Sequence, residues 1–542
     1  MSIYTNKIKI KPVTTPEYKY WDKTETDYNK TQNLILGLPQ FIESGDEERV
    51  NIQELNSPAD STTLADGIIP ITVSYDRKDW FKCCHGLYRD IVFDLQKTSC
   101  VTGFKGVFLY SYEAAVYLPR NFVVYISENG EDWETVYKNN ALTAKLPQEI
   151  FTLEESFEYK HKARFVKFSF DVDIWVMIGE LEVIGTKAIP DTALDVKPIK
   201  EAKRKEINLD KYLMPEDFFG INDLMLAYNC HPGRSDKGKL TVEQLLPYVA
   251  YYDKQGEMKD TFFDAFLFLP FAAFPMRKPE TTQALWHDYV NNTFAKGYNT
   301  DALDFATGEA KSKLNKPEFK TKVFLSILYP FKTQKNFGDL YGNGDNLDFS
   351  VYDDRIKAIK WLINTQLGLF KERNYQNTEL CGFYWFEEQI LATDEGEKEM
   401  IKWTTDYVRS LGFKTIWIPY FRASGYNSWR DYGIDFACMQ PNYSFTKETE
   451  EVLYSNAKIT KQYGMCVEME IGGTSDEKID KYNAYMRVGV EKGYMNSVHM
   501  YYQDGGPGVF YQAFISKNKK LNDVYHNTYK FAKHTLKQDF VK

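Results

Sequence analysis

The 542-residue chain lacks the cysteine pairs, basic runs and long apolar stretches that mark several common classes of protein. Its seven cysteines include no CxxC pair, which predicts reduced thiols that pack as small apolar side chains rather than zinc ligands. No long run of Lys or Arg is present and the formal net charge is −9, so we expect no binding to nucleic acid or anionic membranes. No stretch approaches the roughly 20 apolar residues of a transmembrane helix, so no membrane span is expected.

Motifs of several enzyme classes are also missing from the chain. There is no GxSxG nucleophile elbow, HExxH zinc helix or P-loop, which argues against an esterase, a metalloprotease and an NTPase. The glycine pair at Gly472 and the DGGPG segment from Asp504 are only weakly similar to phosphate-binding loops, so a sugar-phosphate enzyme is the less favoured alternative. The opening MSIYTNKIKIKPVTT has no apolar h-region. We therefore expect no signal peptide in this chain, and a secreted, periplasmic or cell-surface location if one has been removed.

Eight short runs of apolar, β-branched or aromatic residues occupy the last two-thirds of the chain, and each precedes a stretch with helical spacing. Such runs suit buried parallel strands, and their alternation with helices is typical of a (β/α)8 TIM barrel. Gly412, Gly464 and Gly493 stand where helices should end, just before the next strand. The predicted strands begin at Asp223, Asp264, Lys322, Leu380, Lys414, Phe436, Met465 and Ser497.

A front block of alternating strands and turns without helical periodicity predicts an antiparallel β-sandwich over residues 51–190. The segment SENGEDWE from Ser127 places an Asn-Gly turn between two of its strands. We expect an irregular segment over 1–50 that packs on the sandwich, a charged linker over 191–215, and the barrel over 216–542. The chain is thus predicted to have two folded domains.

Polar residues at the C-terminal ends of barrel strands carry the most weight, because active sites form there. The fourth run ends in Glu387 and Glu388, and the seventh carries Glu468 and Glu470, which point to the same side of a strand. Glycoside hydrolysis uses two such carboxyl groups, one as acid and one as nucleophile or base. The alternative interpretation is a set of rim carboxylates in salt bridges.

Other residues near the predicted strands suit hydroxyl-rich rings, since amides and acids bond hydroxyl groups and aromatic rings stack on sugar faces. Aromatic residues make up 16% of the chain, which also suits large cores, so packing is as good an explanation for any single one. These candidates for substrate binding are Tyr228, Asn229, Asp264, Tyr329, Trp385, Trp417, Tyr420, Gln440, Asn442, Tyr443, His499, Tyr501 and Asp504.

Two segments of the front block and its Trp80 carry a family resemblance. TTLADG from Thr62, Trp80 and ARFVKFSF from Ala163 resemble a discoidin (F5/8 type C, galactose-binding-like) domain, a jelly-roll shared by many carbohydrate-binding modules. The resemblance implies glycan contacts on loops at one end. It also implies a structural calcium ion near Asp66 and Gly67, where a turn capped by Asp66 is the alternative. Candidates for those glycan contacts, each also explained by packing, are Trp80, Tyr112, Arg120 and Trp175.

The barrel region resembles an uncharacterised bacterial family of glycoside-hydrolase-like barrels through FFDAFLF from Phe262 and GFYWxxE from Gly382. It is also similar to retaining glycosidases with acid/base on strand four and nucleophile on strand seven, although these usually have Asn-Glu where this chain has Phe-Glu-Glu. The GFYWxxE spacing implies Glu388 as acid/base and Glu470 as nucleophile, with Glu387 and Glu468 as alternates.

The sequence therefore predicts a monomeric glycoside hydrolase that acts on a polysaccharide or glycoconjugate, and the resemblance implies retention of configuration. It needs no organic cofactor and no metal for catalysis. The alternative is a non-catalytic glycan-binding protein built on the same barrel with misplaced carboxylates. A glutamine substitution at Glu388 or Glu470 separates the two, because only an enzyme has turnover to lose.

Overall fold

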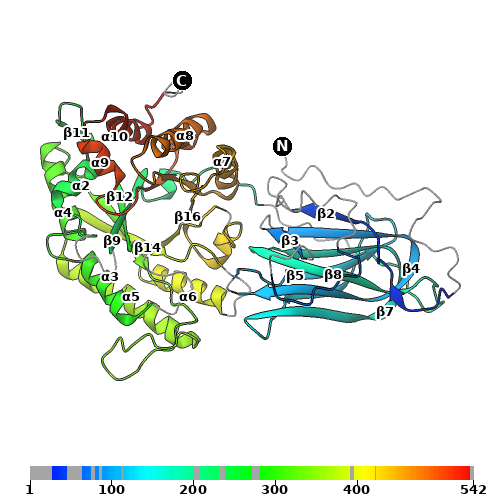
Figure 1. The fold of residues 1–542 in the computed structure, drawn as a ribbon. Coiled ribbons are helices and arrows are strands. Elements are labelled where there is room, and N and C mark those ends of the chain that lie inside the picture. The colour runs from blue at the N-terminus through cyan, green and yellow to red at the C-terminus, as the bar shows by residue number, and fades with distance from the viewer. Residues whose placement is uncertain are drawn as a thin grey trace. The chain divides into compact units, whose positions relative to one another are not determined.

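The computed structural model describes residues 27–44, 64–74, 80–84, 88–112, 114–172, 174–198, 207–230, 238–270, 281–390, 396–421 and 423–537. The chain divides into two compact units, which Figure 1 draws as a sheet-rich part and a part with a central barrel. Unit 1 is formed largely by Met1–Lys205, and unit 2 by most of the chain from Glu206 onward.

Unit 1 is built on an antiparallel sheet of eight strands. These strands are β1 (Gln32–Asn33), β2 (Gln40–Ser44), β3 (Phe81–Cys84), β4 (Tyr88–Ser111), β5 (Arg120–Ser127), β6 (Glu134–Ala141), β7 (Gln148–Asp171) and β8 (Trp175–Thr186). Six follow the order β1-β8-β4-β7-β5-β6, while β2 pairs with β4 and β3 pairs with β8. The two longest strands, β4 and β7, pair along most of their length and so connect all parts of the sheet.

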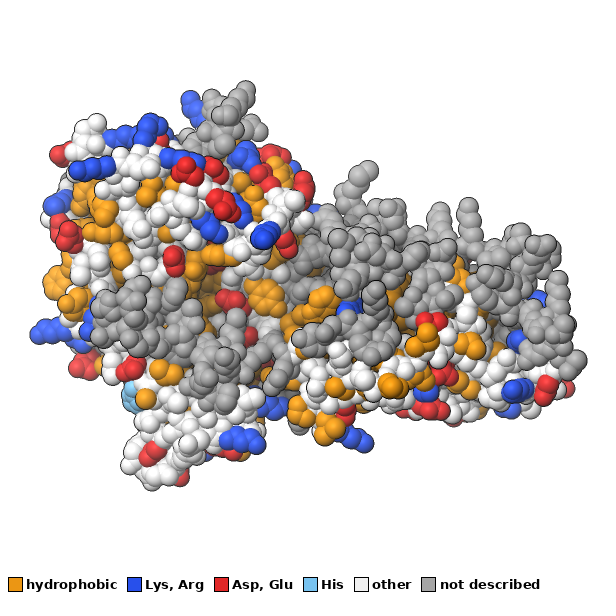
Figure 2. Space-filling model, viewed as in Figure 1, with side chains coloured by type: hydrophobic (Ala, Val, Ile, Leu, Met, Phe, Trp, Pro, Cys, Tyr) orange, Lys and Arg blue, Asp and Glu red, His pale blue; other side chains and the backbone are white. Residues whose placement is uncertain are grey.

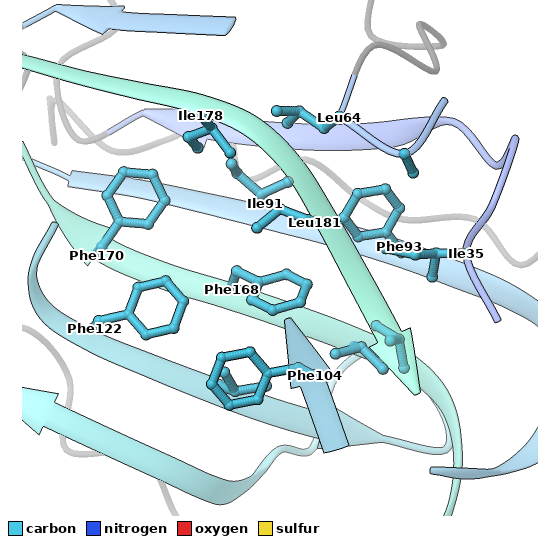
Figure 3. Close-up of a cluster of buried hydrophobic side chains, with 14 of the residues drawn as sticks. Ile35, Leu64, Ile91, Phe93, Phe104, Phe122, Phe168, Phe170, Ile178 and Leu181 are labelled. Carbon is cyan, nitrogen blue, oxygen red and sulfur yellow. The ribbon is translucent and has the colours of Figure 1, made fainter. Parts of the chain in front are cut away.

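The core of unit 1 is a cluster of buried apolar and aromatic side chains from β4, β5, β7 and β8. Phe104 and Phe122 lie 5.9 Å apart between ring centroids, and Phe122 stacks on Phe170 at 6.2 Å. Figure 3 shows these rings facing Ile91, Ile178 and other side chains between the strands. Alternation along each strand supplies these inward residues, as the sequence predicts for this block.

The segment expected to be irregular over 1–50 joins the sheet where it is described. Within it, β1 pairs with β8 and β2 pairs with β4, and Ile35 and Leu38 are buried in the core of unit 1, so backbone hydrogen bonds and apolar packing together place it there. The turn expected at SENGEDWE is confirmed, because β5 and β6 pair antiparallel on either side of it and Gly130 has a φ of 76°.

Unit 2 surrounds a closed barrel of eight parallel strands. These are β9 (Asp223–Cys230), β12 (Ala265–Pro270), β13 (Thr321–Ile327), β14 (Thr378–Trp385), β15 (Lys414–Trp417), β16 (Phe436–Met439), β17 (Cys466–Glu470) and β18 (His499–Tyr502). Each strand pairs with the next in chain order, and β18 pairs with β9 to close the ring. All eight strands predicted for this region are confirmed, and Figure 1 shows helices lying around them.

Helices connect most of the barrel strands. The α-helices are α2 (Val242–Val249), α3 (Gln283–Thr293), α4 (Thr300–Lys313), α5 (Tyr352–Arg373), α6 (Glu397–Ser410), α7 (Glu451–Tyr463), α8 (Asp476–Lys492), α9 (Val509–Ile515) and α10 (Lys519–Ala532). Short 3-10 helices are η2 (Pro215–Asp217), η3 (Trp429–Tyr432) and η4 (Tyr494–Asn496), and a hairpin joins β10 (Ala250–Tyr252) to β11 (Met258–Thr261). Two of the glycines expected at helix ends, Gly464 and Gly493, are left-handed C-caps with φ of 62° and 84°.

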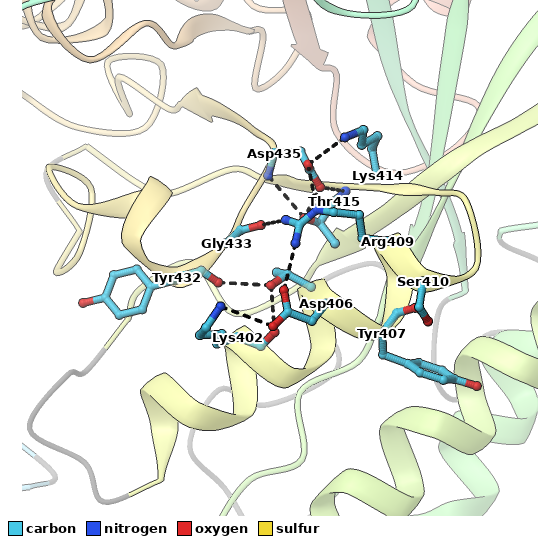
Figure 4. Close-up of polar contacts among 11 residues, drawn as sticks. Lys402, Asp406, Tyr407, Arg409, Ser410, Lys414, Thr415, Tyr432, Gly433 and Asp435 are labelled. Atoms are coloured by element: carbon cyan, nitrogen blue, oxygen red, sulfur yellow. Dashed lines mark hydrogen bonds and ion pairs between the residues drawn. The ribbon is translucent and has the colours of Figure 1, made fainter.

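The fifth strand is not followed by an α-helix, which corrects the expected alternation. The described residues between β15 and β16 contain only η3, whose sequence WRDY is too short to build an apolar helical face. Polar contacts hold this connection instead (Figure 4). The Asp435 carboxylate accepts hydrogen bonds from the backbone N–H and hydroxyl of Thr415 at 2.9 and 3.0 Å, while Arg409 donates to the Gly433 carbonyl and pairs with Asp406.

The ends of the expected linker over 191–215 pack on their own units, and its middle lies outside the described residues. In unit 1, the Lys162 N–H donates to the Leu194 carbonyl at 2.8 Å. In unit 2, the Leu209 and Leu213 N–H groups donate to the carbonyls of Gln462 and Met465. These backbone contacts make both ends parts of folded units.

The cysteine side chains that the structure describes are free and buried, in agreement with the expectation of reduced, packed thiols. They are Cys83, Cys100, Cys381, Cys438 and Cys466. None of the helices in the described ranges combines the length and apolar character needed to cross a bilayer.

Gly382, the first residue of the GFYWxxE segment, is required by the closeness of β14 and β15. An added Cβ would lie 2.1 Å from the Lys414 carbonyl oxygen, which is backbone and cannot turn away. We expect Gly382→Ala to destabilise unit 2 by about 1–3 kcal/mol or more in chemical denaturation. The matched control is Gly368→Ala in α5, where nothing lies within 4 Å and helix propensity should add up to about 1 kcal/mol. Equal stability of the two variants would contradict this account.

Candidate functional site

Three glutamates gather at the C-terminal ends of β14 and β17. Along β17, Cys466 belongs to the core cluster inside the barrel, and Glu468 and Glu470 follow it at two-residue intervals, so their side chains also point inward. Both are only 1% exposed. Glu388 follows β14 by three residues and remains partly exposed. The negative charge of Glu388 raises the pKa of both Glu468 and Glu470, which indicates that the three carboxyl groups face a common space.

Glu470 is held by two hydrogen-bond donors. The Tyr485 hydroxyl, on α8, donates to Glu470 Oε2, and the backbone N–H of Asn442 donates to the same carboxyl group. Burial and, to a smaller extent, the charge of Glu388 raise the pKa of Glu470 to about 8, against the lowering effect of these two donors. The donors fix the orientation of the Glu470 carboxyl group and favour its ionised form.

Glu388 has a smaller shift and one amide neighbour. Burial raises its pKa to about 6, and the side-chain amide of Gln440 opposes this by donating a hydrogen bond to the carboxylate. Gln440 is itself fixed, because its Nε2 also donates to the Ile418 carbonyl at 2.9 Å. Two glutamates of one site therefore have different pKa values, and the higher value belongs to Glu470.

Glu468 lies deeper than the other two. Burial raises its pKa well above the usual range, and the charges of Glu470 and Glu388 raise it further. Tyr228 and Tyr384 belong to or pack against the apolar cluster inside the barrel, and the charges of Glu388 and Glu468 act on both phenols. Glu468 is therefore a neutral carboxyl group at the base of the site near pH 7.

Glu387 differs from Glu388 although the two are adjacent. It is 4% exposed, its backbone carbonyl accepts a hydrogen bond from Trp417 Nε1 at 2.7 Å, and its charge acts on Tyr384. The pKa shifts of Glu468 and Glu470 have Glu388 among their causes and not Glu387. Of this pair, Glu388 is the one that belongs to the carboxyl cluster.

The loop from Asn442 to Thr446 borders the cluster and is tied to α8 and to the segment after β17. Lys478 donates to the Ser444 carbonyl, and Lys481 donates to the carbonyls of Tyr443 and Thr446 at 3.2 and 2.6 Å. The Gly472 N–H donates to Ser444 Oγ at 3.0 Å. Asn442 takes part in the site through its backbone, and the ring of Tyr443 lies 6.1 Å from that of Tyr485.

Three of the expected substrate contacts lie at the opposite end of the barrel or on its outer side. His499 is the first residue of β18, and its Nδ1 and Nε2 lie 3.1 Å from Asp223 Oδ1 and 2.7 Å from the Tyr494 carbonyl. Tyr501 donates to the same Asp223 oxygen at 2.7 Å. Asp264 precedes β12 and accepts two hydrogen bonds from Asn222. These residues brace the N-terminal ends of the strands, which corrects their assignment to the site.

Alternation explains that correction for His499 and Tyr501. Val498 and Met500 belong to the core cluster inside the barrel, so the residues between and after them must point outward. Tyr502, which sequence reasoning did not select, is the next inward residue of β18. Its pKa is raised by burial and by the charges of Asp504, Glu468, Glu470 and Glu388. Of the expected strand-eight contacts, only Asp504 is near the cluster, on an exposed turn with a φ of 67°.

The aromatic and amide candidates on the other strands have structural partners. Asn229 points outward from β9 and donates to Thr293 Oγ1 at 2.6 Å. Tyr329 donates to Glu397 Oε2 at 2.7 Å and packs edge-on against the buried Trp385. Tyr420 donates to Gln389 Oε1 at 2.9 Å. Trp417 is buried, whereas Tyr420 follows the inward residue Ile418 by two positions and forms a β-bridge with Gln440, so Tyr420 lies on the inner side at the mouth of the barrel.

Tyr485, Tyr384 and Phe445 are further residues of the site that the sequence analysis missed. Tyr485 lies 15 positions after Glu470 on a helix, so no strand pattern points to it. Tyr384 could have been found, because it is two residues from Gly382 on the inward face of β14. Phe445 lies in a loop and gives no periodic signal.

In unit 1, the expected glycan contacts are mostly packed. Trp80 is 3% exposed and belongs to a cluster with Leu109 and Met177, so it is a core residue. Trp175 and Tyr112 are half-buried and pack beside Tyr117. Arg120 is half-buried at the start of β5.

Asp66 and Glu180 form the carboxyl pair of unit 1. Asp66 caps its own turn by accepting the Ile68 N–H at 2.8 Å, and Glu180 Oε1 accepts the Gly67 N–H at 3.0 Å. Glu180 is 1% exposed, and its Oε2 has no hydrogen-bond partner. Among the described residues, no group of three His, Cys, Asp or Glu side chains is arranged to hold a metal ion. A calcium ion here would need backbone carbonyls or water as well as the two carboxylates.

The surface of unit 2 carries charges of both signs. Figure 2 shows Lys and Arg side chains interspersed with Asp and Glu side chains over the coloured part of this unit. On this face, the described residues form no broad basic patch of the kind that binds a phosphate backbone.

A closed parallel barrel with a buried carboxyl cluster at one end of its strands defines a class of barrel protein with an internal polar site. The chain belongs to the family described as a domain of unknown function (DUF4855), whose model matches residues 223–530. That range includes every barrel strand and all three clustered glutamates, and it confirms the family of unknown function that the barrel motifs predict. No curated protein matches the chain in sequence.

Several solved structures are similar to a small share of the chain. They include CpGH89CBM32-6 from Clostridium perfringens, with 17% identity over 28% of this chain and 99% of that chain and a TM-score of 0.20. Chitosan-binding module 1 of a Paenibacillus chitosanase/glucanase has 15% identity over 28% of this chain and 99% of that chain, with a TM-score of 0.19. A striped bass (Morone saxatilis) serum fucolectin has 16% identity over 29% of this chain and 50% of that chain, with a TM-score of 0.22. Likenesses of this size carry no conclusion about function.

Proposed function

We propose that the chain is a glycoside hydrolase that cleaves a glycosidic bond in a polysaccharide or glycoconjugate on a (β/α)8 barrel. The observation that carries this proposal is the convergence of Glu388, Glu468 and Glu470 at the strand ends, with pKa values raised to different extents. Groups with strongly shifted pKa values collect at functional sites, and pairs of carboxyl groups with separated values suit acid and nucleophile roles.

In the proposed mechanism, Glu388 donates its proton to the glycosidic oxygen while a Glu470 oxygen attacks the anomeric carbon, and the bond to the leaving sugar breaks. Glu388 then takes a proton from water, whose oxygen displaces Glu470 and releases the sugar with retained configuration. The Tyr485 hydroxyl and the Asn442 N–H hold Glu470 in place for attack. Glu468, neutral and deeply buried, adds no second negative charge near the nucleophile.

The order of the two pKa values runs against this division of roles at pH 7, where a value of about 6 leaves Glu388 mostly ionised and a value of about 8 leaves Glu470 mostly protonated. The charge of Glu388 is one cause of the raised pKa of Glu470, so this cause disappears when Glu388 holds a proton. The proposed reaction uses the form with one proton on Glu388 and none on Glu470, which is the less populated of the two singly protonated forms, and the two values of about 6 and about 8 belong to the pair.

Unit 1 would act as a discoidin-like module that holds the enzyme near its polymer. Tethering raises the local concentration of substrate without taking part in the chemistry. This role is supported by its antiparallel sheet and by the family resemblance of its sequence.

The test is product analysis by mass spectrometry after incubation of wild type, Glu388→Gln and Glu470→Gln with a broad panel of glycans. Release by wild type and not by either variant, with binding retained, is the expected result. Binding by all three proteins without release from any glycan would replace the hydrolase with a non-catalytic glycan-binding protein.

A further inference from the structure

Phe445 combines high exposure with a fixed position. Its side chain is 48% exposed, although it lies in the loop that Lys478, Lys481 and Gly472 hold in place. An exposed phenylalanine on a well-anchored loop leaves apolar surface in water without the freedom of a mobile loop. Such an arrangement suits a surface that a ligand covers.

The ring of Phe445 packs against the backbone that follows Glu470. Gly472 is two residues after Glu470, and a Cβ at this position would lie 2.5 Å from Phe445 Cε1. The absence of a side chain at Gly472 therefore lets the ring rest against the backbone that carries Glu470. Lys478 Nζ lies 5.7 Å from the centre of the same ring.

A row of aromatic rings leads from Phe445 into the barrel. Phe445 meets Tyr502 edge-to-face at 5.2 Å and 89°, and Tyr502 meets Tyr228 at 5.7 Å and 75°. The charges of Glu388, Glu468 and Glu470 act on Tyr502, so the row passes the carboxyl groups. An elongated ligand that follows these rings would have one unit at the carboxyl groups and the next on Phe445.

We propose that Phe445, with Tyr502 behind it, is a stacking subsite for the pyranose ring next to the sugar at the carboxyl groups, on the side of that sugar away from the bond that is cleaved. The apolar C–H face of a pyranose covers an aromatic ring, and its hydroxyl edge reaches Lys478. This inference rests on the proposed function and adds to it a substrate class, a pyranose oligosaccharide longer than the two sugars flanking the scissile bond.

The test compares Phe445→Ala with the matched control Phe305→Ala, which removes a 66% exposed phenylalanine from α4. The probes are cello-, chito-, manno- and galacto-oligosaccharides, together with aryl glycosides of the corresponding single sugars. Phe445→Ala should raise KM about tenfold for the oligosaccharide that wild type cleaves. It should leave kcat/KM on the aryl glycoside unchanged, because a glycoside of one sugar does not reach the subsite, and Phe305→Ala should change neither.

A second variant keeps the aromatic ring but moves it. Gly472→Ala adds a methyl group 2.5 Å from Phe445 Cε1 and so displaces the ring, and it should reproduce much of the rise in KM while the protein remains folded. Cleavage by wild type with the same KM in Phe445→Ala would overturn the subsite and leave the hydrolase intact. If wild type cleaves none of the oligosaccharides, their binding to wild type and Phe445→Ala is compared by titration. Weaker binding by Phe445→Ala supports the subsite alone, and equal binding or none at all overturns it.

Discussion

Glu388→Gln is expected to lower kcat/KM on natural glycans by roughly a hundredfold to ten-thousandfold, because it removes the proton that the leaving oxygen needs. The loss should be much smaller on aryl glycosides with acidic phenols, which leave without protonation. This dependence on the leaving group is measured with a series of nitrophenyl and phenyl glycosides. A uniform loss across the series would show that Glu388 does not act as the acid.

Glu387→Gln is the matched control for this variant. It makes the same chemical change one residue away, at a carboxyl group that is not among the causes of the shifts at Glu468 and Glu470. Activity should stay within a few-fold of wild type. A loss at Glu387 with none at Glu388 would exchange the two assignments.

The pH profile gives an independent readout of the same pair. Below a pH of about 6 both Glu388 and Glu470 hold protons, and above about 8 both are ionised, so kcat/KM of wild type should be bell-shaped between these values. Glu388→Gln removes the proton donor, so its remaining activity should only rise with pH as Glu470 ionises. The midpoint should fall below 8, because the negative charge of Glu388 no longer raises the pKa of Glu470. A bell that persists in the variant would contradict the assignment.

The sequence predicted the barrel strands well, because each is a short apolar run that must be buried on both faces. It failed at the connection after β15, where a network around Asp435 and Arg409 replaces an α-helix. Such a network depends on residues that folding brings together, so no periodic pattern in the local sequence predicts it. Strands β1 and β2 were missed although Ile35 and Leu38 between them are buried in the core of unit 1, because strands of two and five residues are too short to show a period.

In the candidate site too, some residues could be predicted from a local sequence pattern and others only from the folded structure. Glu468 and Glu470 could be found from the sequence, because two carboxylates on the inward face of a buried strand need a reason. His499 and Tyr501 were placed in the site by strand number alone, whereas alternation with Val498 and Met500 turns them outward. Tyr485 and Phe445 come from a helix and a loop, and only the tertiary structure brings them beside Glu470.

Glu180→Gln is expected to stabilise unit 1 at neutral and alkaline pH. Burial, together with the charges of Asp66 and Glu182, raises the pKa of Glu180 to about 8 in the folded state, against about 4.5 in the unfolded chain. The neutral carboxyl group contributes its full stability below about pH 4.5, and this is lost as pH rises toward 8, at about 1.4 kcal/mol per pH unit. At pH 7 the loss is on the order of 3 kcal/mol, which glutamine avoids because it cannot ionise.

Calorimetry of wild type, Glu180→Gln and the control Glu182→Gln tests this, since Glu182 is paired with Lys105 at 3.1 Å and partly exposed. The Tm of unit 1 should fall from pH 5 to 8 in wild type and Glu182→Gln but stay nearly level in Glu180→Gln. A calcium ion between Asp66 and Glu180 would favour the ionised carboxylate, so added calcium should restore the Tm of wild type at pH 8 and have no effect on Glu180→Gln. Equal pH dependence of all three proteins would show that Glu180 is ionised in the folded state. A wild-type Tm that calcium does not change would show that unit 1 does not bind calcium at this position.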